Sequence, residues 1–319
     1  MQIELAIVLV LAGFVLLMYS ADILVDNASE LGSQLGISAL LIGIIVVGFG
    51  TSAPELFVSA MASLNGKGNL ALGNALGSNI TNIGMVLGAA ALIRVLPIEQ
   101  NTARRDIPLV FISGVLAVLL VLDGVLSTIN GLVLLIVLIS YLVWAAKKQT
   151  PPTEESQPND TADEPKQSKT TLILCLWIVG SIIALMLGSK ILVSGAVTIA
   201  EYFGVGELII GLTIVAIGTS LPELAAAIAA ARKGAHAMII GNIIGSNVFN
   251  TLGVLALTGI IKTTEVDTSA LWRDFPVMFA FTFLMLIFAL TKGRFGRTEG
   301  SIFLGGYIAY ILYLIASSV

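Results

Sequence analysis

Two glutamates, Glu55 and Glu223, lie within apolar stretches of this sequence, and each ends a copy of the same short polar motif. The first copy reads GFGTSAPE over residues 48–55, and the second reads AIGTSLPE over residues 216–223. A carboxylate in hydrocarbon costs on the order of several kcal/mol unless it is partnered, so it is by default a functional residue. Two such carboxylates in one repeated frame predict a cation-binding site inside a membrane.

A second polar motif follows each glutamate at the same distance. It reads GNALGSNITN over residues 73–82 and GNIIGSNVFN over residues 241–250. The offset between the copies is 168 residues, and segments 36–88 and 204–256 are identical at 21 of 53 positions without a gap. At this offset the following residues pair: Thr51 with Thr219, Ser52 with Ser220, Ser78 with Ser246, and Asn82 with Asn250. We therefore expect the two halves of the chain to contribute equivalent ligands.

The spacing within each motif places its oxygen atoms on one helix face. Thr51 lies four residues before Glu55 and Ser52 lies three before it, which puts their side chains on a common face. In the next segment, Asn74, Ser78 and Asn82 recur every four residues and line one stripe. The inventory is entirely oxygen, because the chain holds one cysteine and one histidine.

Hard cations prefer such oxygen ligands, and soft or nitrogen-rich metal sites are disfavoured. Calcium accepts six to eight oxygens in a flexible geometry, whereas magnesium demands a stricter octahedron. Two glutamates would neutralise one Ca²⁺, or would share several Na⁺ with neutral oxygens. An antiporter requires a site that can bind either Ca²⁺ or Na⁺, but not both at once.

The composition indicates an all-α polytopic membrane protein. The mean hydropathy is +0.99 and charged residues make up 11% of the chain, against about 25% in soluble domains. Apolar stretches of about 20 residues, each long enough to cross a bilayer as a helix, recur throughout. We predict ten transmembrane helices, near residues 3–25, 37–64, 68–94, 106–122, 125–146, 169–198, 205–232, 236–262, 269–291 and 299–317.

The basic residues predict the orientation in the membrane. With these ten spans, the side that carries the amino terminus receives only Lys67, Lys262 and Arg273, while Lys190 lies within a span. The other twelve Lys and Arg fall on the opposite side, and positive charge marks the cytoplasm. We therefore expect a multi-pass protein of the plasma (inner) membrane with both termini outside. Lys and Arg near span ends set topology, so we expect no nucleic-acid partner.

Five spans in each half would place the halves in opposite orientations, as two inverted five-helix repeats. The first repeat would cover residues 1–146 with its motif region at 43–88, and the second 169–319 with its motif region at 211–256. Residues 147–168, rich in Pro, Glu, Ser, Thr and Gln, predict a disordered cytoplasmic linker. Inverted repeats are the plan of many secondary transporters, with the ion site near the midplane where broken helices meet.

Proline and glycine predict where those helices break. Pro54 and Pro222 lack an amide hydrogen and clash with the preceding turn, so each should interrupt its helix. Gly48 and Gly50 in the first copy, and Gly218 alone in the second, should loosen the same turn. Alternatively, these glycines serve helix packing alone.

The paired motifs GTS-x-PE and GN-x-x-GSN-x-x-N resemble the two alpha-repeats of the calcium/cation antiporter superfamily, most closely the prokaryotic sodium/calcium exchangers. The likeness covers essentially the whole chain. It implies alternating access, with the first and sixth spans sliding across a rigid core. It also implies these ligands: Glu55 and Glu223 for Ca²⁺ with Thr51 and Thr219; Ser52, Ser78, Ser220 and Ser246 for flanking Na⁺ sites with carbonyls near Gly48 and Ala216; and a central Asn82.

One position departs from the family pattern. Asn250 stands where archaeal exchangers and the potassium-dependent branch carry an aspartate, which disfavours K⁺ co-transport and leaves two central carboxylates. The GNA-x-E signature of the proton-coupled branch is absent from residues 73–77. Exchange of H⁺ for Ca²⁺, or for another divalent cation, at the same site remains the alternative, since an intramembrane glutamate can carry protons.

Two other classes of function fit less well. A cation channel usually places its filter on an oligomer axis, whereas this chain contains its own pseudo-symmetric pair, so we infer no obligate protein partner. An intramembrane hydrolase would need an acid and an activated water, and it gives no reason for the paired hydroxyls and amides. We therefore predict a non-enzymatic transporter without a prosthetic group, whose ligands are Ca²⁺ and Na⁺ and whose surroundings are the lipid bilayer.

Overall fold

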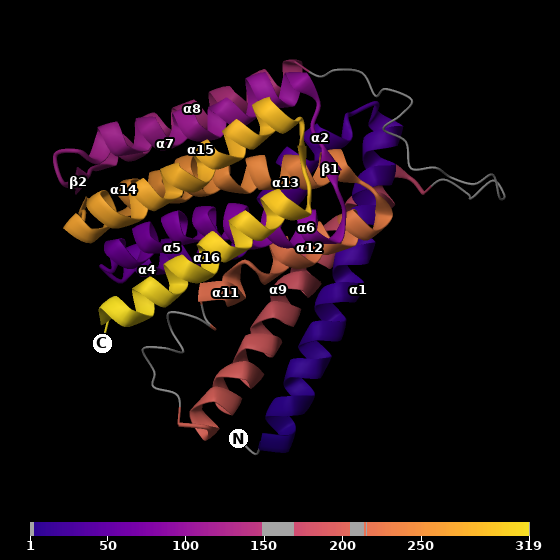
Figure 1. The fold of residues 1–319 in the computed structure, drawn as a ribbon, viewed down its shortest axis with the longest axis horizontal. Helices are drawn as coiled ribbons and strands as arrows, with labels where there is room; N and C mark the ends of the chain where they lie inside the picture. Colours follow the sequence, from indigo (N-terminus) through magenta and orange to yellow (C-terminus); the bar gives the residue numbers. More distant parts are fainter. Residues whose placement is uncertain (1–2, 149–168, 205–213, 215, 319) are drawn as a thin grey trace.

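The computed structural model of the protein describes residues 3–148, 169–204, 214 and 216–318. Almost all of the predicted linker, 147–168, lies outside these residues. The described part is mostly helical, with four strands of two residues each (Figure 1). Several helices contain a widened π-helical turn, which is labelled η below.

The elements of the first half, in order, are α1 (Ile3–Leu35), α2 (Ala39–Ile42), η1 (Gly43–Gly48), α3 (Phe49–Thr51), α4 (Ala53–Leu64), α5 (Gly68–Thr81), η2 (Asn82–Leu87), α6 (Gly88–Ile93), β1 (Leu96–Pro97), η3 (Thr102–Asp106), α7 (Ile107–Val121), β2 (Val125–Leu126) and α8 (Thr128–Lys147). Those of the second half are α9 (Thr171–Tyr202), α11 (Ala216–Thr219), α12 (Leu221–Lys233), α13 (His236–Val248), η6 (Phe249–Val254), α14 (Leu255–Ile261), β3 (Thr264–Glu265), η7 (Ala270–Asp274), α15 (Phe275–Lys292), β4 (Arg294–Phe295) and α16 (Arg297–Ser318).

Seven helices of the described chain are long and apolar enough to cross a membrane, and the bent helix over residues 39–64 makes an eighth if it counts as one span. Two predicted spans are not among these eight. Span 106–122 corresponds to α7, which continues without a break from η3 and so forms one helix over Thr102–Val121. It is not among the eight because its first turns carry the charged residues Arg104, Arg105 and Asp106. Of span 205–232, residues 205–213 and 215 lie outside the described residues. The first helix continues to Leu35, ten residues beyond the expected boundary at 25.

The two motif helices break where the prolines predict. The first bends by 43° between Thr51 and Ala53, and Ser52 at the break has φ −83° and ψ 2°. At the equivalent break in the second half, Ser220 has φ −92° and ψ 7°. Each proline lies in the first turn of the following helix, where its missing N–H costs no hydrogen bond. The predicted breaks are thus confirmed.

The long helices α1 and α9 lie side by side and extend away from the rest of the bundle (Figure 1). They run antiparallel, because Gly195 of α9 packs on Ala6 of α1, and Gly13, which is later in α1, packs on Leu192, which is earlier in α9. At the opposite end of the pair, Gln34 donates a hydrogen bond to the Lys169 carbonyl. Glycine at these crossings lets the two backbones approach closely.

A charged contact joins α1 to the end of α12. Lys233 Nζ lies 2.7 Å from Asp26 Oδ1 and 3.6 Å from Asp22 Oδ1. All three side chains are partly exposed, so the pairing contributes roughly 0–1 kcal/mol to stability. The contact therefore orients α1 against α12 more than it stabilises the fold.

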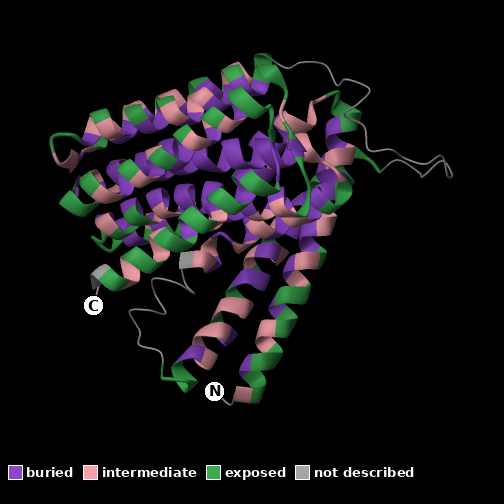
Figure 2. Cartoon of the chain, viewed as in Figure 1, coloured by how far each residue is buried: buried purple, intermediate pink, exposed green. Residues whose placement is uncertain are grey.

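The centre of the bundle is formed by the helices that carry the GN motifs. Most of α5 and all but the first residues of α13 are buried, whereas α8 and α16 expose much of their apolar surface (Figure 2). Close glycine contacts join the halves here. A Cβ added at Gly245 of α13 would lie 2.4 Å from the Ile44 carbonyl oxygen, and one at Gly43 would lie 2.4 Å from that of Met238.

Glycine at the break also serves packing. A Cβ at Gly48 would lie 3.1 Å from Ser246 N, and one at Gly218 would lie 2.4 Å from a methyl of Val193. Both residues have a helical backbone, so close packing is the requirement for glycine that this structure supports. This favours the packing alternative over a loosened turn.

The peripheral parts of the two halves also correspond at the 168-residue offset. Turn η3 begins at Thr102 and η7 at Ala270, and each ends with a neighbouring Arg–Asp ion pair. Strand β1 pairs with β4 and β2 with β3, both antiparallel, so each short sheet contains one strand from each half. The correspondence therefore extends well beyond the motifs.

Candidate ion-binding site

Glu55 and Glu223 lie in the first turns of α4 and α12, directly after the two helix breaks. Their exposed fractions are 0% and 1%. The amino end of a helix carries a partial positive charge that favours a nearby anion. The breaks therefore place two carboxylates in the interior, each at a helix amino terminus.

The halves meet at these carboxylates. Ser52 of the first half donates a hydrogen bond of 3.3 Å to Glu223 Oε1 of the second, and Thr51 also lies beside Glu223. Ser78 of α5 lies beside Glu55, and the two carboxylates are close enough to interact electrostatically. The structure thus brings these five predicted residues to one place.

The carboxylates lack countercharge within the described chain. Glu55 Oε1 and Oε2 and Glu223 Oε2 have no hydrogen-bond partner there, and no described Lys or Arg forms an ion pair with either residue. Two like charges without partners in a low-dielectric interior are strongly unfavourable. The arrangement calls for bound cations or protons.

An asparagine side-chain amide occupies the equivalent position in each of the two helices that carry the GN motifs. Asn82 begins η2, and Asn250 is the second residue of η6. Both side chains are fully buried, and neither their nitrogen nor their oxygen has a hydrogen-bond partner among the described residues. An unpartnered buried amide is costly, and its oxygen is a suitable ligand for a hard cation.

The hydroxyl residues of the motifs occupy two kinds of position. Thr51 Oγ1 lies 3.0 Å from the Val47 carbonyl, one turn back on its own helix. Ser246 Oγ lies 3.3 Å from the Gly48 carbonyl in the other half. Ser220 is buried at the second break, with its Oγ unpartnered in the described structure. Thr219 ends α11 and is half-buried.

Sequence reasoning left two asparagines out of the expected ligand set. Asn242 Oδ1 lies 3.3 Å from both Thr51 Oγ1 and Ser246 Oγ, and it therefore bridges the halves. Its equivalent, Asn74, instead donates to Ser59 Oγ at 2.9 Å and to the Glu55 carbonyl at 3.3 Å. The signal was available, because each asparagine follows a glycine of the repeated motif and begins the polar stripe.

Among the described residues, no group of three or more His, Cys, Asp or Glu could hold a metal ion. A cation held here would therefore combine the two carboxylates with hydroxyl, amide and backbone oxygens. Such a mixed set of oxygens suits Ca²⁺ or Na⁺.

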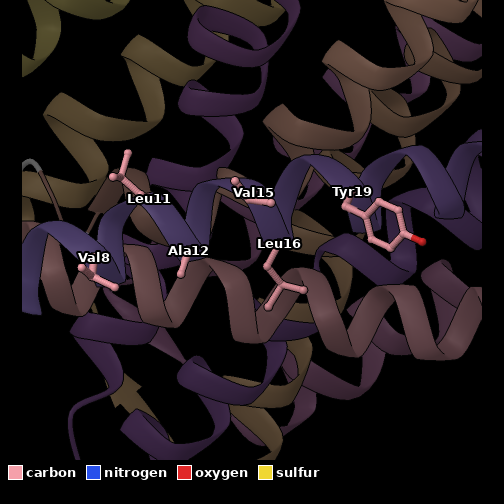
Figure 3. A pocket seen from close by; sticks show the side chains of 6 residues that line it. All are labelled: Val8, Leu11, Ala12, Val15, Leu16 and Tyr19. Atoms are coloured by element: carbon pink, nitrogen blue, oxygen red, sulfur yellow. The ribbon is translucent and has the colours of Figure 1, made fainter.

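A shallow groove of about 520 Å³ runs along α1, away from these carboxylates. Its lining residues all come from one helix: Val8, Leu11, Ala12, Val15, Leu16 and Tyr19 (Figure 3). The wall is apolar apart from the tyrosine hydroxyl, so the groove has no ligands for a cation. It belongs to the apolar exterior of α1.

Comparison with known proteins defines the family. The sodium/calcium exchanger protein family matches residues 5–147 and 173–316. The chain is 42% identical to the putative antiporter CaxA of Alkalimonas amylolytica, over 98% of this chain and 99% of the relative. It is 40% identical to the inner membrane protein YrbG of Escherichia coli, over 97% of each. The sodium/calcium exchanger MaX1 of Methanosarcina acetivorans is 30% identical, over 96% of this chain and 97% of the relative.

Solved structures agree with these relatives. The sodium-calcium exchanger NCX_Mj soaked with zero Na⁺ and Ca²⁺ superposes with a TM-score of 0.84 at 31% identity, over 98% of this chain and 100% of that one. The same exchanger soaked with 10 mM Na⁺ and zero Ca²⁺ gives 0.84 at 32% identity, over 98% and 99%. The chain belongs to the sodium/calcium exchanger family and is a multi-helix membrane transporter, as the motif resemblance indicated.

Proposed function

We propose that this protein is a secondary antiporter that exchanges Na⁺ for Ca²⁺, with Glu55 and Glu223 as the central ligands of both ions. The observation that carries the proposal is the pair of buried carboxylates, with three of their four oxygens unpartnered in the described structure. Ion binding relieves the repulsion between them, and it neutralises charges that the membrane interior disfavours.

The surrounding oxygens support a site that accepts either ion. Two carboxylates balance the charge of one Ca²⁺, and the amides of Asn82 and Asn250 add neutral ligands. Thr51 and Thr219 would assist the glutamates at Ca²⁺, and they would serve Na⁺ when it replaces Ca²⁺. The hydroxyls of Ser52, Ser78, Ser220 and Ser246 would serve the Na⁺ ions that flank the carboxylates. Because Ca²⁺ and Na⁺ need the same glutamates, they compete for the site, and this competition is the basis of exchange.

The architecture supports alternating access. We infer ten transmembrane helices in two inverted repeats, residues 1–146 and 169–319, joined by a cytoplasmic linker at 147–168. The antiparallel packing of α1 and α9, which are equivalent helices of the two repeats, agrees with inversion. These two helices would slide across the bundle and open the site to each side in turn. Both termini would then lie on the outer side of the cytoplasmic membrane.

Replacement of each central carboxylate tests the proposal. Glu55→Gln and Glu223→Gln keep the size of the side chain but remove half of the central charge, so we expect either variant to lose exchange by more than about tenfold. Na⁺-driven Ca²⁺ flux in proteoliposomes measures the loss. Glu4→Gln, at an exposed position of α1, is the matched control and should transport normally. Full activity in either central variant would remove the glutamates from the mechanism.

Exchange driven by H⁺ instead of Na⁺ is the second candidate, because the same lack of a countercharge at these buried carboxylates also suits protons. A carboxylate in that setting can be neutralised by a proton as well as by a cation. The same glutamate variants would then lose flux driven by a pH gradient.

A further inference from the structure

Asn74 and Asn242 occupy equivalent positions in the two halves but make different hydrogen bonds. Asn74 stays within its own half, where its Nδ2 donates to Ser59 Oγ at 2.9 Å. Asn242 reaches into the other half, where its Oδ1 lies 3.3 Å from Thr51 Oγ1. The pseudo-symmetry of the motifs is therefore broken at this pair.

One residue difference accounts for the break in symmetry. Position 59 is serine in α4, and the equivalent position 227 in α12 is alanine. Both residues are buried, Ser59 at 0% and Ala227 at 1% exposure. An alanine side chain offers no acceptor, and Asn242 Nδ2 has no hydrogen-bond partner in the described structure. Asn242 is thus not held by α12 in the way that Asn74 is held by α4.

The position of Asn242 affects four oxygens of the candidate site. A hydroxyl has one hydrogen to donate and two lone pairs. Thr51 Oγ1 can give its hydrogen to the Val47 carbonyl at 3.0 Å or to Asn242. Ser246 Oγ can give its hydrogen to the Gly48 carbonyl at 3.3 Å or to Asn242. When Asn242 takes both hydrogens, the two carbonyls are released from these bonds, and the hydroxyl lone pairs can face a cation.

We propose that Asn242 is a positioning residue of the ion site, which orients Thr51 and Ser246 toward a monovalent cation. Ala227 permits this role because it offers Asn242 no competing hydrogen-bond acceptor. The inference rests on the proposed exchange function. The four oxygens are all neutral, so they match Na⁺ better than Ca²⁺, which depends more on the carboxylates. The two halves of the site are consequently not equivalent for Na⁺.

The substitution Ala227→Ser tests this directly, because it gives α12 the acceptor that Asn74 has on α4. We expect Asn242 to turn toward the introduced hydroxyl, and the Na⁺ concentration for half-maximal exchange to rise about fivefold, as the loss of one neutral hydrogen bond would produce. The Ca²⁺ concentration for half-maximal exchange should stay within about twofold. Asn242→Ala should likewise raise the half-maximal concentration for Na⁺ and not that for Ca²⁺.

The matched control is Ala231→Ser, one turn further along α12. Its equivalent in the first half, Ser63, donates to the Ser59 carbonyl of its own helix at 2.8 Å, so the introduced hydroxyl can satisfy itself without reaching Asn242. We expect wild-type values for both ions. Adding Ala227→Ser to the Asn242→Ala protein should produce no further change, since the coupled partner is gone.

Equal changes for Na⁺ and Ca²⁺ in Ala227→Ser, or identical behaviour of Ala227→Ser and Ala231→Ser, would overturn the assignment. An additive double variant would overturn it as well. If Ala227→Ser does not fold, judged by size-exclusion chromatography, Asn242→Ala alone decides. It should raise the Na⁺ concentration for half-maximal exchange and leave the Ca²⁺ concentration within about twofold. Failure of the exchange function itself is distinguishable, because the wild-type protein would then show no Na⁺-dependent Ca²⁺ flux.

Discussion

Glu55 and Glu223 are kept in the interior with almost none of the hydrogen bonds that buried carboxylates normally require. Only Glu223 Oε1 has a partner within the described chain, the Ser52 hydroxyl at 3.3 Å. Burial without partners costs far more than a surface position, so the fold gives up stability at these two residues. The proposed ion site explains that cost, because the transported cations would supply the missing partners.

Asn250 gives a prediction at the same scale. Its amide is fully buried and unpartnered in the described structure, and it would be one of the neutral central ligands. Asn250→Asp adds a third carboxylate near the first two, so ion coupling or potassium sensitivity should change. The measurement is the dependence of Ca²⁺ flux on Na⁺ and K⁺, with Asn65→Asp at an exposed helix end as the control. Unchanged coupling would place Asn250 outside the site.

The sequence predicted the candidate site residues more completely than it predicted the contacts between them. The repeated frame marked Glu55 and Glu223 because charge is rare in apolar spans. The contact between Asn242 and Thr51 was not visible, because these two residues are 191 positions apart in the chain and belong to different halves. A fixed offset reports which positions are equivalent, and it does not report which residues of the two halves touch.

At the scale of elements, the helix breaks followed from local chemistry, whereas the helix ends did not. Proline excludes a continuous helix near residues 54 and 222, and both breaks occur two residues earlier, at serine. The end of α1 at Leu35 was missed by ten residues because hydropathy falls at Asp22 and Asp26. Those aspartates stay helical and contact Lys233 of α12, a partner that local sequence does not reveal.

Glycine contacts between elements lead to a stability prediction. A Cβ at Gly245 would lie 2.4 Å from the Ile44 carbonyl oxygen and 2.8 Å from Ile44 Cα, so the helix η1 would have to move away from α13. We expect Gly245→Val to lower the apparent melting temperature and to reduce exchange. Overpacking of this kind costs about 1–3 kcal/mol. Thermal unfolding in detergent measures the change.

The control for this substitution is Gly180→Val in α9, where an added Cβ meets no described atom within 4 Å. Valine is compatible with an apolar transmembrane helix, so the control should unfold near the wild-type temperature. Equal effects of the two substitutions would mean that the close contact between η1 and α13 is not a stability determinant.

At the scale of the whole molecule, equivalent helices of the two halves face each other with reversed direction. The antiparallel pair of α1 and α9 and the two strand pairs are each built from one element of either half. Composition and periodicity predicted the helical membrane class. They did not predict the β1–β4 and β2–β3 pairings, because two-residue strands carry no periodic signal.

The inverted arrangement predicts which loops face outside. With the exposed Cys175 replaced by alanine, Asn65→Cys should react with a membrane-impermeant maleimide in intact cells. Lys292→Cys, on the side with most of the basic residues, should react only after permeabilisation. Labelling of intact cells scored by gel shift distinguishes the two. The reverse pattern would invert the orientation, and labelling of both in intact cells would contradict the ten-span topology.

Ca²⁺ uptake by the purified protein in proteoliposomes is the most direct measurement of ion exchange. Vesicles loaded with Na⁺ and diluted into Na⁺-free buffer should accumulate Ca²⁺, whereas vesicles loaded with K⁺ should not, and a pH gradient alone should drive no uptake. Uptake that follows only the pH gradient, with no response to internal Na⁺, would contradict Na⁺/Ca²⁺ exchange and assign the two glutamates to proton-coupled transport.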